Sequence, residues 1–315
     1  MVAGLVVCLT LTGLSTAASV ASAATSSQGC ASPGTSATLT VEVKGFARTA
    51  IVHVPRGSTD STPLALVLNL HGSGATALDQ ELFSGMNRTS NEDDFIVAYP
   101  QGLIADGSGY DWNVPNEPLI GGRAVPKGSA NDITFLATLV KVLESKYCIN
   151  QSEVYATGFS GGAREVSQLA CDESHLFAAV APISGLRRPK PCPTSRAVPV
   201  IAFHGSADPV DPFMGNGQTY WTYSVPTAEK DWARQDDCSL KPVTSRLSGG
   251  VTLTSYSHCA NGSAVQLYEV TGEGHEWPGG PVMPSSLTAE LGPQSNAIDA
   301  NAETWAFFKA HPLAG

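Results

Sequence analysis

The stretch Val154-Tyr155-Ala156-Thr157-Gly158-Phe159-Ser160-Gly161-Gly162 decides the fold of this 315-residue chain. Its first four residues predict a buried strand, and the segment from Gly161 to Ala170 predicts a helix. Between them stands the pattern G-x-S-x-G, which in a strand–turn–helix context lifts a serine hydroxyl above the end of a strand. The glycines allow the close packing that this tight turn needs, and the start of a helix favours negative charge. Ser160 is therefore the candidate nucleophile.

Short apolar runs flank this stretch on both sides and predict further strands, several of them buried on both faces. The expected strands are Thr38–Val43, Thr49–Val54, Leu64–Leu70, Phe95–Tyr99, Val154–Thr157, Phe177–Ile183, Val198–Phe203 and Val265–Val270. Apolar residues at helical spacing predict a helix over Asp132–Tyr147, capped by Asn131 or Asp132, and another over Asn296–Ala310. Strands that alternate with helices predict an α/β fold, with a mostly parallel central sheet and helices on both faces.

Ligands bind at the carboxyl ends of the strands in such sheets, so the loops that follow the strands are where chemistry is expected. The loop after Val198–Phe203 contains Asp208, which is the candidate acid of a catalytic triad. Asp211 is a rival three residues further on, but Asp208 lies closer to the strand end. An aspartate in a turn that only accepts local backbone hydrogen bonds is the alternative interpretation.

The candidate base is His275, in the loop after Val265–Val270. Triads at this kind of serine turn run serine, acid, histidine along the chain. Beyond Asp208 there are two other histidines, but His258 precedes the last predicted strand and His311 follows the last predicted helix. Only His275 stands on a loop that directly follows a strand.

An oxyanion hole requires two backbone N–H groups. One is expected from Gly161, which follows the nucleophile. The other is expected from Ser73, in the loop after Leu64–Leu70, through its N–H and not through its side chain. His71 in the same loop is interpreted as a structural residue that holds the loop.

The remaining loops indicate the shape of the site. The segment from Ser184 to Ala197 is too short to hold a lid, so we expect no lid domain and an open cleft. Trp112 stands in a long segment after Phe95–Tyr99, and Trp277 stands just after His275. Long loops in compact domains are usually functional, so both rings are candidate substrate-binding residues that stack on a flat substrate. Simple packing of the loops is the alternative interpretation.

Composition and cysteine usage place the chain outside the cell. The charged fraction is only 15%, and the net charge of −10 argues against nucleic acid and anionic membranes as partners. Residues 1–24 are predicted to be a signal peptide, residues 25–36 a flexible lead-in, and residues 37–315 a single catalytic domain. Six cysteines remain after the signal, an even number that suits disulfides in an exported protein. The expected pairs are Cys238–Cys259, which flank an apparent hairpin, and, with less support, Cys171–Cys192 and Cys30–Cys148.

Further motifs concern metals and modification. There is no C-x-x-C and no H-E-x-x-H, so no metal site is expected. N-x-S/T sequons begin at Asn87, Asn150 and Asn261, and they matter only if the host glycosylates exported proteins.

The chain resembles the family of secreted esterases that includes polyhydroxybutyrate depolymerases and feruloyl esterases, which adopt the α/β-hydrolase fold. The resemblance covers most of the chain from about Val41 onward. It is carried by ordered motifs: Leu70-His71-Gly72, Tyr99-Pro100-Gln101-Gly102, Trp112-Asn113, Asn131-Asp132-Ile133, Gly158-Phe159-Ser160-Gly161-Gly162, His204-Gly205-Ser206-Ala207-Asp208 and Gly274-His275-Glu276-Trp277-Pro278-Gly279-Gly280. It implies the same triad, no metal and no organic cofactor. Relatives often carry another residue at the position of Ser73, which a backbone donor should tolerate.

The resemblance also implies the reaction. We expect a secreted serine carboxylesterase. The preferred interpretation is a feruloyl esterase that acts on feruloylated plant cell-wall polysaccharide. The main alternative is a depolymerase of poly(3-hydroxybutyrate) or short polyhydroxyalkanoates; such enzymes usually carry an extra polymer-binding domain, for which the chain has no room after its last predicted helix. More remote alternatives are a secreted peptidase and an inactive binding protein. We expect a monomer whose partner is an ester substrate.

Overall fold

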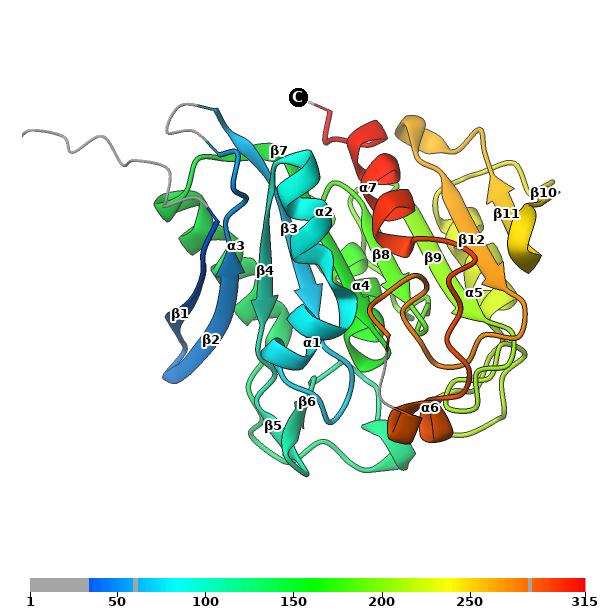
Figure 1. Cartoon of the computed structure of the whole chain (residues 1–315), viewed down its shortest axis with the longest axis horizontal. Coiled ribbons are helices and arrows are strands. Elements are labelled where there is room, and N and C mark those ends of the chain that lie inside the picture. The colour runs from blue at the N-terminus through cyan, green and yellow to red at the C-terminus, as the bar shows by residue number, and fades with distance from the viewer. Residues whose placement is uncertain (1–33, 59–61, 283–284, 315) are drawn as a thin grey trace, which may run out of the picture.

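The computed structural model describes residues 34–58, 62–282 and 285–314, so the predicted signal peptide and most of the lead-in lie outside it. Within the described residues, ten strands form one mixed sheet in the order β1-β2-β4-β3-β7-β8-β9-β12-β11-β10 (Figure 1). These strands are β1 (Ser36–Val43), β2 (Phe46–His53), β3 (Leu64–Leu70), β4 (Phe95–Pro100), β7 (Ile149–Phe159), β8 (Val180–Ile183), β9 (Val200–Gly205), β10 (Val243–Arg246), β11 (Val251–Tyr256) and β12 (Val265–Val270). A separate hairpin pairs β5 (Ile104–Asp106) with β6 (Gly109–Asp111).

The middle of the sheet is parallel and its two sides are antiparallel. The strands β4, β3, β7, β8, β9 and β12 pair in parallel in that order. The hairpin β1–β2 joins β4 in antiparallel fashion on one side, and β11 and β10 follow β12 on the other. The prediction of a mostly parallel sheet is confirmed.

Helices cover both faces of this sheet. In Figure 1, α1, α2 and α7 lie in front of the sheet and α3, α4 and α5 lie behind it, while α6 lies near the lower edge. The helices are α1 (Ala77–Ser84), α2 (Met86–Asp93), α3 (Asp132–Lys146), α4 (Gly161–Asp172), α5 (Val225–Gln235), α6 (Ser285–Leu291) and α7 (Ala300–Ala310), and short 3-10 turns span Ile120–Gly122, Ser248–Gly250 and Ala260–Gly262.

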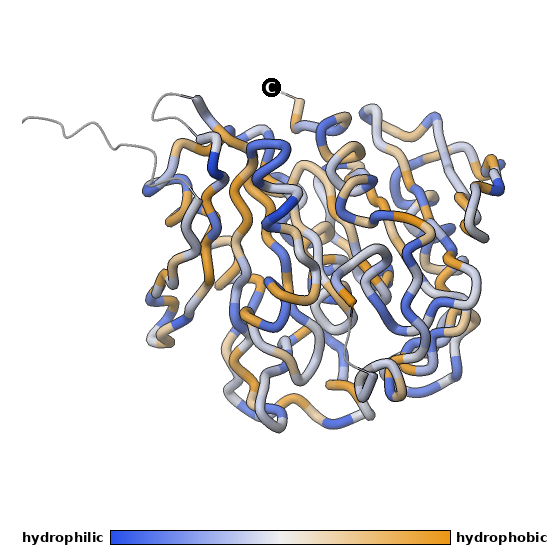
Figure 2. The backbone as a smooth tube through the Cα atoms, in the orientation of Figure 1, coloured by the Kyte–Doolittle hydropathy of each residue, from blue (hydrophilic) through white to orange (hydrophobic). Residues whose placement is uncertain are grey.

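The side chains of each buried strand are shared between two cores, because successive side chains of a strand point to opposite faces of the sheet. In β3, Leu66 and Leu68 belong to the core shared with α3, α4 and α5, whereas Ala65 and Val67 belong to the core shared with α1, α2 and α7. Every residue of β3 is buried, as expected for a strand that is covered on both faces. Figure 2 shows hydrophobic residues along these central strands.

The helix predictions hold with shifted ends. Asn131 caps α3, because its Oδ1 accepts a hydrogen bond from the N–H of Thr134 at 2.7 Å. The last helix begins at Ala300 rather than Asn296, because Asp299 accepts hydrogen bonds from the N–H groups of Asn301 and Ala302 and so caps the helix there.

Two predicted strands begin later than expected. Phe177 is not in β8, because its N–H donates to the carbonyl of Glu173 in the turn that follows α4. The strand β9 begins at Val200 rather than Val198, since Pro199 has no N–H to donate to a ladder.

The hairpin expected between Cys238 and Cys259 is present, formed by β10 and β11, and the disulfide between these cysteines is confirmed. The Cys171–Cys192 disulfide is confirmed too. Cys148 is disulfide-bonded, but Cys30 lies outside the described residues, so the third pair stays a prediction.

The carboxyl ends of the parallel strands point to the lower edge of the sheet in Figure 1. The segment 184–199 between β8 and β9 contains neither helix nor strand, as the short interval predicted. Nothing in the described part of the chain forms a helix long and apolar enough to cross a bilayer.

Candidate active site

Ser160 stands at a strained turn between β7 and α4. Its φ of 53° and ψ of −116° lie in a region that non-glycine residues rarely adopt. The N–H of Ser160 donates to the carbonyl of Ile183 in β8 at 2.9 Å, which fixes the turn against the sheet. Strain of this kind persists at functional sites where the surroundings enforce it.

The glycines beside Ser160 are required by close backbone contacts. A Cβ atom on Gly162 would lie 2.5 Å from the carbonyl oxygens of both Leu70 and His71. A Cβ atom on Gly158 would lie 2.8 Å from the carbonyl of Gly162. No side chain fits at either position, so the helix α4 packs directly against the ends of β3 and β7.

His275 lies in the loop after β12 and contacts Asp208. Its Nδ1 lies 2.7 Å from Oδ2 of Asp208, and both side chains are almost fully buried. Because the carboxylate can only accept, Nδ1 carries the proton and Nε2 is left as an acceptor. Burial alone would lower the pKa of His275, but the charge and hydrogen bond of Asp208 outweigh it and raise this pKa above 6.5.

Asp208 is held from both sides. Its Oδ1 accepts hydrogen bonds from the N–H groups of Val210 and Asp211, each at 2.8 Å. Its Oδ2 also lies 3.3 Å from Nε2 of His204. Burial alone would raise the pKa of Asp208, but the two histidines outweigh it and hold this pKa well below its usual range. The carboxylate therefore stays charged and fixed in place.

The role of His204 was not predicted from the sequence, where the residue appears only as the first of a motif that ends at Asp208. Its Nε2 lies 2.7 Å from the carbonyl oxygen of Asp211, which can only accept, so Nε2 carries the proton. That proton also points toward Asp208. The sequence feature that could have identified His204 as a site residue is its position at the end of the strand β9, four residues before Asp208.

The rival Asp211 is also buried, but its carboxylate makes no hydrogen bond to His275. Neither of its carboxylate oxygens has a hydrogen-bond partner within the described residues. Burial raises its pKa. Of the two aspartates, Asp208 is the one that the fold places against the histidine.

The loop after β3 brings Ser73 next to Gly161. A Cβ atom on Gly161 would lie 3.2 Å from the backbone nitrogen of Ser73 and 2.5 Å from its Oγ. A Cβ atom on Gly72 would lie 3.4 Å from Cβ of Ser160. The two backbone amides selected as oxyanion donors therefore lie beside each other and beside the candidate nucleophile.

His71 fixes the peptide that carries the Ser73 N–H. Its Nδ1 lies 2.8 Å from the carbonyl oxygen of Gly72, which belongs to the same peptide unit. Its Nε2 accepts from the N–H of Gly102 at 2.9 Å, so Nδ1 carries the proton. Burial lowers the pKa of His71 to about 4, so at neutral pH the imidazole stays uncharged, with its proton on Nδ1. Since the C=O and N–H of a trans peptide point in opposite directions, this ring sets the direction of the Ser73 N–H.

Ser160 and His275 open onto one cavity of about 750 Å³. This volume lies in the range of small-molecule sites. In this structure the Ser160 hydroxyl makes no hydrogen bond to His275, which is common before substrate binds. The larger apolar side chains that line the cavity, none of which was predicted from the sequence, are Leu82, Phe83, Ile120, Phe159, Val210, Val282 and Leu291.

The proposed stacking role of the two tryptophans needs correction. Trp112 is 2% exposed, and its Nε1 donates to the carbonyl of His71 at 2.7 Å. Trp277 is fully buried, and its Nε1 donates to Oδ1 of Asn301 at 3.0 Å. Neither ring lines the cavity. Both pack loops against the core, so the prediction that they bind substrate is wrong.

The chain is similar in sequence to known esterases. No protein-family model matches the chain. A protein of Nocardia uniformis subsp. tsuyamanensis named Putative esterase NocK is 30% identical over 288 residues, covering 82% of this chain and 80% of that protein. Feruloyl esterase B of Piromyces equi is 27% identical, covering 72% of this chain and 42% of its own length. Poly(3-hydroxyalkanoate) depolymerase C of Paucimonas lemoignei is 26% identical, with 76% and 60% covered.

Solved structures support the fold. An acetyl xylan esterase from Aspergillus awamori superposes with a TM-score of 0.56 at 19% identity, covering 80% of this chain and 98% of that one. An S-formylglutathione hydrolase from Agrobacterium tumefaciens superposes with a TM-score of 0.54 at 12% identity, covering 87% and 94%. The chain therefore has the α/β-hydrolase fold that its motifs implied.

Proposed function

The chain belongs to a family of carboxylic ester hydrolases of the serine-hydrolase type, and we propose that Ser160, His275 and Asp208 form its catalytic triad. The observation that supports the triad is the buried 2.7 Å contact between His275 and Asp208 beside the cavity onto which Ser160 opens. This arrangement leaves Nε2 of His275 free to accept a proton from a serine hydroxyl.

In the first half of the reaction, Nε2 of His275 takes the Ser160 proton as Oγ attacks the ester carbonyl. The negative charge that develops on the carbonyl oxygen is stabilised by the N–H groups of Ser73 and Gly161. The tetrahedral intermediate then collapses, the C–O bond to the alcohol breaks, and the alcohol leaves with the proton from His275. An acyl group remains on Ser160.

In the second half, His275 takes a proton from water, which attacks the acyl carbonyl. The same two N–H groups stabilise the second oxyanion. The bond between the acyl carbon and Oγ breaks, the proton returns to Ser160, and the acid leaves. Asp208 stays charged throughout and stabilises the imidazolium in both halves.

The favoured substrate is an ester of an aromatic acid, as in feruloylated plant polysaccharide. The rings of Phe83 and Phe159 lie 4.6 Å apart at the cavity, and Phe159 lies 4.8 Å from the ring of His275. These faces suit an aromatic acyl group next to the nucleophile. Several relatives, such as Feruloyl esterase B, are named as feruloyl esterases, which supports an aromatic ester as the substrate. The N-terminal apolar segment and the disulfides support export from the cell.

A depolymerase of hydroxyalkanoate esters is the second candidate. Exposed apolar side chains surround the cavity mouth: Leu82 is 64% exposed and Val282 is 87% exposed, and both line the cavity. Leu78 is 53% exposed one helical turn before Leu82 on α1. Such a rim suits an apolar polyester chain.

The experiment that separates the two candidates compares kcat/KM for methyl ferulate with kcat/KM for a 3-hydroxybutyrate trimer. We expect methyl ferulate to be the better substrate by at least about tenfold, which is about 1.4 kcal/mol of transition-state stabilisation. A preference for the trimer would replace the first candidate by the second. Absence of activity on both esters, in folded protein, would contradict both.

Removing the Ser73 N–H should impair turnover far more than removing the Ser73 side chain. Ser73→Pro lacks the backbone donor, and loss of one oxyanion donor lowers kcat by about 10²- to 10³-fold. Ser73→Ala keeps the N–H and should stay near the wild-type rate. Steady-state kinetics on a soluble ester measures both, with thermal melting as the check on folding. Equal losses in the two variants would place the oxyanion donor elsewhere.

Activity should fall as pH falls through the pKa of His275. Only the neutral imidazole accepts the serine proton, and the Asp208 carboxylate raises this pKa above 6.5. The acid limb of kcat/KM for a neutral ester should therefore have its midpoint above about pH 6.5, the ordinary histidine value. A profile measured between about pH 5 and pH 9 tests this. A midpoint well below the ordinary value would show that Asp208 does not stabilise charged His275.

A further inference from the structure

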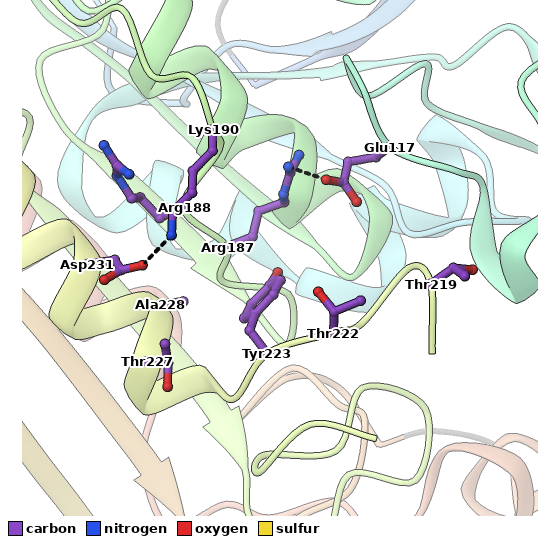
Figure 3. Close-up of a pocket in the computed structure, with 10 residues that line it drawn as sticks. All are labelled: Glu117, Arg187, Arg188, Lys190, Thr219, Thr222, Tyr223, Thr227, Ala228 and Asp231. Atoms are coloured by element: carbon purple, nitrogen blue, oxygen red, sulfur yellow. Dashed lines mark hydrogen bonds and ion pairs between the residues drawn. The ribbon is translucent and has the colours of Figure 1, made fainter. Parts of the chain in front are cut away.

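A second cavity, of about 260 Å³, lies apart from the catalytic cleft and shares no lining residue with it. Figure 3 shows its side chains converging from three loops and from the helix α5. Arg187, Arg188 and Lys190 come from the loop after β8, Thr222 and Tyr223 precede α5, and Glu117 comes from the long loop after β6.

Three cations and two carboxylates line this cavity, so one positive charge is left over. Arg187 pairs with Glu117 through Nη2, and Nζ of Lys190 lies 3.1 Å from Asp231. Within the described residues, Arg188 has no ion pair; its Nη2 donates to the neutral side-chain oxygen of Gln235. The excess charge therefore resides on Arg188.

The walls also hold donors that the protein itself does not satisfy. The Arg187 side chain is only 6% exposed, yet its Nη1 has no hydrogen-bond partner in the part of the chain that the structure describes. The same is true of Nε of Arg188 and the hydroxyl of Tyr223. Buried donors without partners are costly, and nearly all such groups in folded proteins find an acceptor. A carboxylate offers only acceptors and matches the geometry of arginine.

The size and the other walls of the cavity narrow the class of ligand. Besides Tyr223, three threonines line it, Thr219, Thr222 and Thr227, and their hydroxyls can donate to or accept from the hydroxyls of a sugar. The volume is slightly below the usual range of small-molecule sites, which suits one sugar ring. A single excess charge suits a monoanion better than a phosphate, which carries about two charges at neutral pH.

Two loops connect this cavity with the catalytic cleft. In the loop after β6, Glu117 lines the second cavity and Ile120 lines the cleft. In the segment before α5, Val210 lines the cleft and Thr219 lines the second cavity. The loops touch each other, because a Cβ atom on Gly122 would lie 2.8 Å from Oγ1 of Thr219. The two cavities therefore border the same pair of loops.

We propose that the second cavity is a subsite for a uronic acid, a sugar that bears a carboxylate, on the same polysaccharide whose ester is cleaved at Ser160. The carboxylate pairs with the guanidinium of Arg188, and the threonines contact the ring hydroxyls. This proposal rests on the polysaccharide esterase function, although binding of the sugar itself requires no catalysis.

The binding test uses the full chain and three small probes, with affinity measured by calorimetry or ligand-observed NMR. We expect D-glucuronate to bind more tightly than D-glucose and more tightly than inorganic phosphate. Arg188→Gln should weaken glucuronate binding by about tenfold or more, the usual effect of losing a charge-assisted hydrogen bond. Lys190→Gln, at a largely exposed side chain, should weaken it less, and Arg246→Gln on β10, which makes the same charge change away from the cavity, should leave it unchanged.

Glucuronate that binds no better than glucose overturns the proposal, and so does a glucuronate affinity that Arg188→Gln and Lys190→Gln both leave unchanged. Phosphate that binds more tightly than glucuronate, and is lost in Arg188→Gln, would instead identify a site for free phosphate. These binding outcomes do not depend on esterase activity. A failure of the sugar subsite can therefore be distinguished from a failure of the proposed function.

The kinetic test compares feruloylated oligosaccharides with and without a glucuronate substituent. Arg188→Gln should raise KM by about tenfold for the acidic substrate alone, with kcat unchanged. Its kinetics on methyl ferulate, which cannot reach the second cavity, should match those of wild type. An equal rise in KM for the neutral oligosaccharide would assign Arg188 a structural role and contradict the proposal.

Discussion

Ser160→Ala is expected to lower kcat for ester hydrolysis by about 10⁵- to 10⁶-fold, the loss seen when the nucleophile of a serine triad is removed. The physical reason is that Ser160 is the hydroxyl at the strained turn after β7, and without its Oγ the acyl intermediate cannot form there. The residual rate comes from the oxyanion donors and substrate binding alone. The measurement is the steady-state rate on a soluble nitrophenyl ester, followed for long enough to detect slow turnover.

Ser167→Ala is the matched control for this variant. Ser167 is a buried serine on the same helix, α4, but its hydroxyl donates to the carbonyl of Ala163 and does not line the cavity. Its turnover should stay near that of wild type. If Ser160→Ala retained a substantial fraction of the wild-type rate, the nucleophile would have to be another residue.

Asp208→Asn is expected to lower kcat by about 10⁴-fold, because an amide favours the wrong histidine tautomer and cannot stabilise the imidazolium. In the native site Nδ1 of His275 donates to Oδ2 of Asp208 at 2.7 Å. An asparagine in that place can present its NH₂ group, which turns the proton of the ring toward Ser160. The variant therefore preserves the shape of the site while removing the base.

Asp211→Asn is the control, since it makes the same change three residues away. Asp211 is buried but makes no hydrogen bond through its carboxylate to any described residue, so its kcat should stay within about tenfold of wild type. Thermal melting of both variants checks that they fold. A larger loss in Asp211→Asn than in Asp208→Asn would reverse the assignment of the acid.

The central sheet could be predicted because its signal is local. Residues 95–99 are a continuous apolar run, residues 64–70 are apolar except for Asn69, and the structure buries every residue of both. A run of this kind is stable only when helices cover both faces, so fold class followed from the pattern. The order of the motifs along the chain then placed Ser160, Asp208 and His275 after β7, β9 and β12, where parallel strands end together.

Elements with weak local patterns could not be predicted. The strand β10 is exposed along its whole length and has no apolar face, so it pairs with β11 only because that neighbour is present. The helix α5 has Pro226 in its first turn and buries Val225, Ala228 and Trp232 at helical spacing, a periodic signal that the sequence prediction missed. For the hairpin of β10 and β11, only the flanking cysteines Cys238 and Cys259 gave an indication in the sequence.

The tryptophans show why residue type and loop length do not establish a binding role. Trp112 stands in a long loop, as substrate-binding residues often do, but its ring packs 4.7 Å from the ring of His71, beneath the loop that carries Ser73. Whether a ring faces a cavity or the core depends on how two distant loops pack. The residues that line the cleft, such as Phe83 and Ile120, come from helices and loops whose meeting point only the folded chain defines.

The most direct test of the triad is covalent trapping with a fluorophosphonate, which reacts only with a serine that a neighbouring base has activated. The labelled protein is digested and the modified residue is located by peptide mass spectrometry. We expect one phosphonate adduct, on Ser160, formed in step with the loss of esterase activity and absent from Asp208→Asn over the same time. Complete inactivation with the adduct on a different residue, or full activity in protein labelled at Ser160, would contradict the account.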